Sequence, residues 1–150
     1  MYFWKTKELA NKIKNNELTE ADRKNYYLAG LVIMYAGIYF VYANPRSDTF
    51  SLLLEAILII LVSVIGINVT FKSNGGNSGN DYIARVVALL FPITIKIVIS
   101  SLVVGIVIGF AMAAMSLPKL YVNYAATFVT VIFQALTFWR LNVAIKYVNT

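Results

Sequence analysis

Four long apolar runs, separated by short polar segments, dominate the pattern of this chain. They cover residues 26–43, 50–71, 83–115 and 122–139. A helix needs about 20 apolar residues to cross the ~30 Å hydrocarbon layer of a bilayer. The runs lack the polar outer face of a helix in a water-soluble bundle, and they lack the short alternating segments of a β-barrel. The pattern predicts an all-α integral membrane protein, a four-helix transmembrane bundle that forms one domain.

The third run is longer than one untilted crossing, because 33 helical residues rise about 50 Å. We favour an interfacial helix at 82–91, a hinge at Pro92 and a crossing at 93–115. Lys96 would then lie at the inner boundary of the membrane, where its long side chain reaches water. The alternative is one long tilted helix, in which Lys96 and Glu55 lie at matching depth as a buried ion pair.

Lysine and arginine are unevenly distributed between the two sides of these runs. Of the 13 in the chain, 11 lie in the N-terminal segment, in residues 72–96 and at the C-terminus. Positive residues favour the cytoplasmic side. We therefore expect a multi-pass protein of the cell inner (plasma) membrane with both termini in the cytoplasm. Residues 72–81, rich in glycine and asparagine, are interpreted as a flexible cytoplasmic loop.

Residues 1–18 have the pattern of an amphipathic helix, with apolar side chains on one face and lysines around it. Such a helix lies in the membrane interface, or the segment is a solvated tail that helps to set the topology. Thr19, followed three residues later by Asp22, predicts a capped start of the helix that enters the first run. Five residues beside the predicted crossings are assigned to the lipid interface: Trp4, Lys5, Arg85, Trp139 and Arg140.

The residue types present argue against enzymatic chemistry. The chain contains no cysteine and no histidine, so it lacks thiol nucleophiles, imidazole acid–base groups and the commonest metal ligands. No phosphate-binding or dinucleotide motif is present. We expect no enzyme activity, no cofactor and no metal site. The net charge of +6 lies beside the predicted spans, which indicates orientation and attraction to anionic lipid rather than nucleic-acid binding.

A few polar residues fall within the predicted spans: Glu55, Asn68, Lys96, Thr130 and Gln134. A carboxylate is costly in lipid, so Glu55 should face protein or water, or reach outward to the headgroups. Gln134 and Thr130 lie on one stripe of the fourth run. We favour a role in hydrogen bonding between helices over the lining of a wet path.

Small residues recur every four positions in the third run, at Ser101, Gly105, Gly109 and Ala113. This spacing stacks them on one helical face, and the missing side chains allow another helix backbone to approach closely. The ridge serves either packing within the chain or a homo-oligomer interface.

Several short motifs resemble those of a group of small, uncharacterised bacterial inner-membrane proteins. They are MYFWK at residues 1–5, LTE at 18–20, DYIAR at 81–85 and FP at 91–92. The resemblance implies four spans and no particular activity. The size and layout also resemble small multidrug resistance transporters. Those transporters carry their essential carboxylate in the first span, whereas here Glu55 lies in the second, so no functional residue is carried over.

The expected function is that of a non-enzymatic, self-associating membrane subunit. It would form a small oligomeric pore, or anchor a larger assembly through a soluble cytoplasmic partner. The alternative is a proton- or cation-coupled transporter of small solutes that uses Glu55. A third hypothesis is an adaptor for another membrane complex. The expected partners are the lipid bilayer, further copies of the chain and a cytoplasmic protein.

Overall fold

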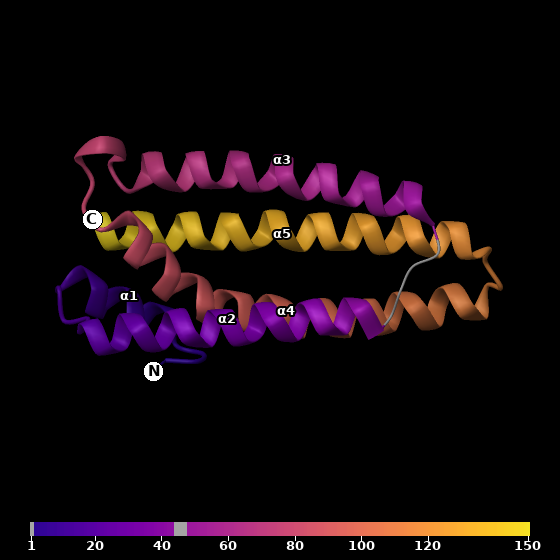
Figure 1. Ribbon diagram of the computed structural model, residues 1–150, viewed down its shortest axis with the longest axis horizontal. Coiled ribbons are helices and arrows are strands. Elements are labelled where there is room, and N and C mark those ends of the chain that lie inside the picture. The colour runs from indigo at the N-terminus through magenta and orange to yellow at the C-terminus, as the bar shows by residue number, and fades with distance from the viewer. Residues whose placement is uncertain (1, 44–47) are drawn as a thin grey trace.

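The structure, a computed structural model, describes residues 2–39 and 48–150 together with the helical backbone of 40–43. This part of the chain contains helices and no strand (Figure 1). The α-helices are α1 (Thr6–Lys14), α2 (Glu20–Ala43), α3 (Thr49–Ser73), α4 (Tyr82–Ala114) and α5 (Lys119–Asn149). One short 3₁₀ turn, η1 (Gly76–Ser78), lies between α3 and α4.

Helices α3, α4 and α5 are long and apolar enough to cross a membrane. This confirms the prediction of a helical membrane protein. The predicted span at 26–43 forms most of α2, but the side chains of its last residues lie outside the described part. The fourth crossing therefore stays a prediction.

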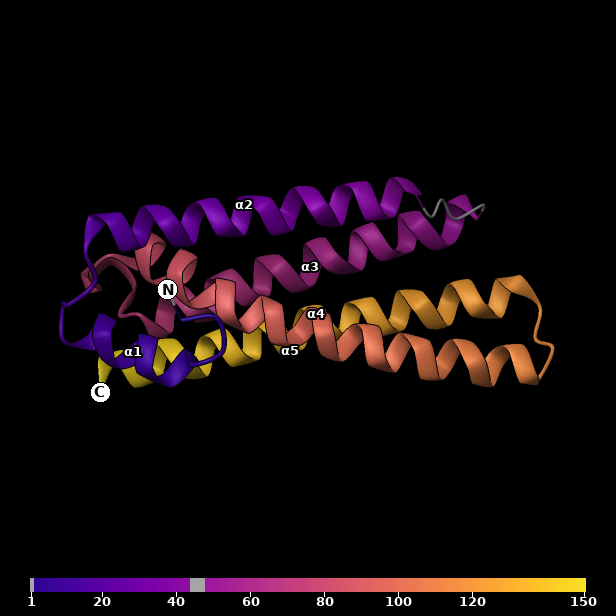
Figure 2. The ribbon, with the colours of Figure 1, turned by 90° about the horizontal axis from the view of Figure 1, so that it is seen from below.

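The long helices run roughly along the same direction (Figures 1 and 2), and their contacts connect them in the order α3, α5, α4, α2. Helix α5 packs on α3 and on α4, while α2 packs on α4. The short α1 contacts both α4 and α5 beside the two chain ends. Because α2 and α3 do not pack on each other, the described helices form an open arrangement rather than a closed bundle.

The buried core lies at the end of the molecule that holds both termini. It combines residues from α1, α2, α4 and α5: Leu9, Ala10, Ile13, Tyr26, Ala88, Leu89, Phe91, Ile93, Leu141, Ala144, Ile145 and Val148. Farther along α4 the apolar side chains are open, with Phe110 75% and Val107 62% exposed. Such a surface requires an apolar solvent or another helix to cover it.

Helix α1 is amphipathic, but its apolar face is covered by protein. Leu9 and Ile13 are buried in the core against α4 and α5. Trp4 remains 54% exposed, and the exposed Lys5 pairs with Glu8 at 2.9 Å. The apolar face of α1 is thus used for tertiary packing, which a sequence pattern does not distinguish from burial in lipid.

The start of α2 has the predicted cap. The Thr19 hydroxyl accepts a hydrogen bond from the Asp22 N–H at 3.1 Å and donates one to Asp22 Oδ2 at 2.9 Å. The Thr19 N–H also donates to Asp22 Oδ2 at 3.3 Å. These reciprocal contacts satisfy N–H groups that have no partner within the helix.

Thr19→Ala is expected to raise the pKa of Asp22 toward its ordinary value, because the Thr19 side-chain hydrogen bond holds that pKa down. A depressed carboxyl pKa contributes stability above the unfolded-state pKa, and this contribution is lost as pH falls through the folded-state pKa. The lost cap should also cost about 1 kcal/mol of stability. An NMR titration of Asp22 in both proteins measures the shift, and an unchanged pKa would contradict this assignment.

Helix α4 differs from the favoured prediction. It runs unbroken from Tyr82 to Ala114 with Pro92 inside it, so no separate interfacial helix exists at 82–91. Pro92 lacks an N–H group and its ring crowds the preceding turn, which bends a helix without necessarily ending it. Figure 1 shows the first turns of α4 inclined to the remainder. Buried neighbours on both sides of Pro92, including Leu89 and Ile93, hold the helix together through the bend.

The loop at 72–81, interpreted as flexible, is organised around buried Asn74. The Asn74 side-chain amide donates to the Asn80 carbonyl at 3.1 Å and accepts from Arg85 at 3.0 Å. A Cβ atom on Gly79 would overlap the backbone of Asn74, and Gly75 has a φ of +99°. The glycines therefore permit a tight turn around a buried amide, whereas composition alone suggested a loose linker.

Candidate functional site between helices α4 and α5

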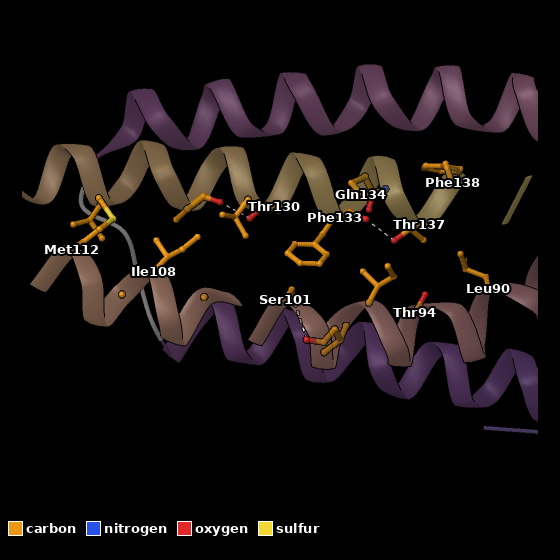
Figure 3. A pocket seen from close by; sticks show the side chains of 17 residues that line it. Leu90, Thr94, Ser101, Ile108, Met112, Thr130, Phe133, Gln134, Thr137 and Phe138 are labelled. Carbon is orange, nitrogen blue, oxygen red and sulfur yellow. Dashed lines mark hydrogen bonds between the residues drawn. The ribbon is translucent and has the colours of Figure 1, made fainter. Parts of the chain in front are cut away.

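An open groove of about 590 Å³ separates α4 from α5 (Figure 3). Most of its wall is apolar, and Ile108 of α4 and Phe133 of α5 point into the space between the helices. The residues of its wall with polar side chains or none are Thr94, Ser101, Gly105, Gly109, Thr130, Gln134 and Thr137.

The groove brings together two predicted sets of residues that are distant in the sequence. Ser101, Gly105 and Gly109 come from the small-residue ridge of α4. Thr130 and Gln134 come from the polar stripe of α5. Ala113, the last member of the ridge, lies on α4 but does not line the groove.

The two glycines of the ridge are uncovered. A Cβ atom added to Gly105 or Gly109 would meet nothing within 4 Å, and both residues are exposed. Within the described part of the chain, no other helix uses this ridge for close approach. The described residues leave Gly105 and Gly109 without a partner helix at close range, and the choice between packing within the chain and a homo-oligomer interface stays a prediction.

Three of the four hydroxyl groups of the groove wall, those of Ser101, Thr130 and Thr137, are engaged within their own helices. They donate to carbonyl oxygens three or four residues earlier: Ser101 to Val98 at 2.8 Å, Thr130 to Ala126 at 2.9 Å, and Thr137 to Phe133 at 2.8 Å. A hydroxyl that satisfies its own backbone has no proton left to donate to water or solute. This arrangement suits packing better than a hydrated path.

Gln134 joins helices α5 and α3. Its side-chain amide donates to the Ser63 hydroxyl at 3.1 Å, while the residue also lines the groove. A hydrogen bond of this kind stabilises helix pairs in lipid, by about 0.6 kcal/mol on average. Asn68 instead donates to the Val64 carbonyl of its own helix at 2.8 Å.

Helices α3 and α5 approach closely at Gly66, which the sequence reasoning did not single out. Gly66 is buried, and a Cβ atom there would overlap the ring of Phe138. A signal was present in the sequence, because Ser63, Gly66 and Thr70 are small residues spaced three and four apart on α3. That stripe contains no GxxxG motif, which is the pattern by which Gly105 and Gly109 were selected.

Glu55 faces α5. Its Oε2 atom accepts a hydrogen bond from the buried Thr127 hydroxyl at 3.1 Å. The ion pair between Glu55 and Lys96, considered as an alternative, is not among the ion pairs of the described residues. Lys96 Nζ instead donates to Thr6 of α1 at 3.0 Å. Glu55 lies six residues into α3, about 9 Å from its start. Lys96 instead contacts α1, which packs beside the two chain ends.

The residues assigned to the lipid interface have different environments. Trp139 is 55% exposed, and the Arg140 guanidinium lies 5.2 Å from the centre of its ring. Arg85 is instead half-buried and fastens three segments, because it donates to Asn74 and, at 2.6 Å, to Asn149. These amide acceptors become neighbours of Arg85 only on folding, and the assignment of Arg85 to the lipid interface stays a prediction.

Among the described residues, no group of three or more acidic, histidine or cysteine side chains could hold a metal ion. The chain matches no protein-family model, no curated protein and no solved structure.

Proposed function

We propose that this protein is a non-enzymatic, self-associating membrane subunit, in which the α4–α5 groove receives a helix of a second copy. The observation that carries the proposal is the uncovered pair Gly105 and Gly109 in an apolar groove. Lipid tails are as apolar as the helices, so helices associate in a membrane where small residues permit close packing. Glycines four residues apart on one face favour such an approach.

An anchoring role fits the groove better than a pore. Three of the four hydroxyl groups of its wall donate to their own backbone, and Gln134 donates to Ser63. A hydrated pore needs polar groups that remain available to ions or water. We therefore favour association through packing, with the packed end of the molecule available to a soluble partner.

The membrane placement in this proposal follows from helix lengths. Lys96 precedes Ala114 by 18 residues, a rise of about 27 Å, and Arg140 follows Lys119 by 21 residues, about 32 Å. Both distances are close to the ~30 Å hydrocarbon thickness. The core formed by α1 and the ends of α4 and α5 would then lie at the membrane surface, on the cytoplasmic side by the positive-inside rule. Helix α2 would supply the fourth crossing.

The test measures the mass of the wild-type protein in mild detergent and its ion flux in proteoliposomes. We expect more than one copy per particle and no flux. The variant Glu55→Gln distinguishes our proposal from a transporter, because the transporter hypothesis depends on this carboxylate. Glu55 lies within the predicted spans and contacts Thr127. Flux that is abolished by Glu55→Gln would replace our proposal with a transporter, and a monomer at every concentration would exclude self-association.

A further inference from the structure

A second hollow, of about 540 Å³, lies where α1, α4 and α5 meet. Each helix contributes one cationic residue to its wall: Lys7, Lys96 and Arg140. Three residues with hydroxyl groups complete the polar part: Thr6, Ser100 and Tyr147. Among the described residues, no carboxylate lines it. The wall therefore carries only positive formal charge.

These three cations have no carboxylate partner in the described part of the chain. The ion pairs there involve Lys5 and Arg23 instead. Lys96 Nζ donates to the Thr6 hydroxyl at 3.0 Å, and Lys7 Nζ lies 6.0 Å from the centre of the Tyr147 ring. Neutral contacts of this kind leave the charge uncompensated, so an anion entering the hollow would be attracted by all three helices.

The position of the hollow indicates the kind of anion. Lys96 and Arg140 both lie about 30 Å from the far ends of their helices, which is the depth at which lipid phosphates begin. The remainder of the wall is apolar, with Ile93, Ile97 and Val143 among its residues. A phosphate would meet the cations while an attached acyl chain would cover apolar surface. Free inorganic phosphate would meet the cations but would leave the apolar part of the wall uncovered.

We propose that this hollow binds the phosphate group of an anionic phospholipid and thereby fastens α1 to the spans α4 and α5. Basic recesses between membrane helices at the bilayer surface bind such headgroups. Arg140 supplies a planar donor group that suits two phosphate oxygens, and the lysines supply compact point charges. The site depends on the crossing of α4 and α5, and is independent of self-association.

The test is a lipid titration of the full chain in neutral detergent, followed by native mass spectrometry. Phosphatidylglycerol and phosphatidylcholine with identical acyl chains are compared, and inorganic phosphate is titrated separately. We expect at least tenfold tighter binding of phosphatidylglycerol than of either alternative. Each cation near a membrane surface contributes roughly fivefold in affinity. The double variant Lys96→Gln, Arg140→Gln should therefore lose tenfold or more.

The matched control is Lys72→Gln, which removes an exposed charge from the end of α3, outside the hollow. It should leave the affinity unchanged. An equal loss of phosphatidylglycerol affinity in Lys72→Gln would indicate general electrostatic attraction of anionic lipid to the protein, and it would contradict a specific site in the hollow. Inorganic phosphate bound as tightly as phosphatidylglycerol would overturn the lipid assignment. If circular dichroism shows that the double variant is unfolded, Lys7→Gln at an exposed position replaces it, and affinity unchanged by Lys7→Gln would contradict the proposal.

Discussion

Replacing Gly66 by leucine is expected to separate α3 from α5 and to destabilise the protein strongly. Even one added methyl group would overlap the Phe138 ring, and a leucine brings three further carbon atoms into the same contact. Overpacking of a tight contact typically costs about 1–3 kcal/mol, and we place Gly66→Ala in that range with Gly66→Leu above it. Reversible unfolding in mixed micelles, followed by circular dichroism, measures the change.

The control for this prediction is Gly37→Leu in α2, because a Cβ atom on Gly37 meets nothing within 4 Å. We expect its effect on the free energy of unfolding to be small. A second control is the pair Gly66→Ala, Phe138→Leu, in which the smaller side chain should recover part of the loss. Equal stability of Gly66→Leu and Gly37→Leu would show that α3 and α5 do not approach closely at this point.

Gly105→Leu and Gly109→Leu are expected to have the opposite profile, weakening self-association while leaving the fold of the single chain intact. Both positions are open within the chain, so leucine meets no intramolecular neighbour there. In the proposed oligomer the leucine would fill the groove that receives the second copy. An overpacked contact costs about 1–3 kcal/mol, which corresponds to a loss of roughly fivefold to more than a hundredfold in the association constant.

Sedimentation equilibrium in density-matched detergent measures this association for the wild type and both variants. Gly37→Leu again serves as the control, because it adds the same side chain to an uncovered glycine outside the groove. Loss of association in Gly37→Leu, or retention of the wild-type constant in both groove variants, would place the interface elsewhere.

The candidate site was predictable in its components but not in its assembly. The sequence reasoning selected Gly105 and Gly109 on α4 and Gln134 on α5 from spacing and polarity. The groove that unites them depends on how α4 and α5 diverge. Gly66 was not selected from the sequence, because its role depends on contact with Phe138, a residue 72 positions away. Helix periodicity identifies which residues share a helical face, but it does not indicate which other helix packs against that face.

Local chemistry alone determined the helical class of this protein and the start of α2. Long apolar runs become helices in a membrane because every backbone polar group must be satisfied within its own segment, and the Thr19–Asp22 cap joins residues three positions apart. The tertiary structure decided the continuity of α4 through Pro92, the packing of α1 on protein, and the capture of Arg85 by Asn74 and Asn149. These outcomes depend on partners that become neighbours only when distant segments meet, so no local pattern could distinguish them from the alternatives.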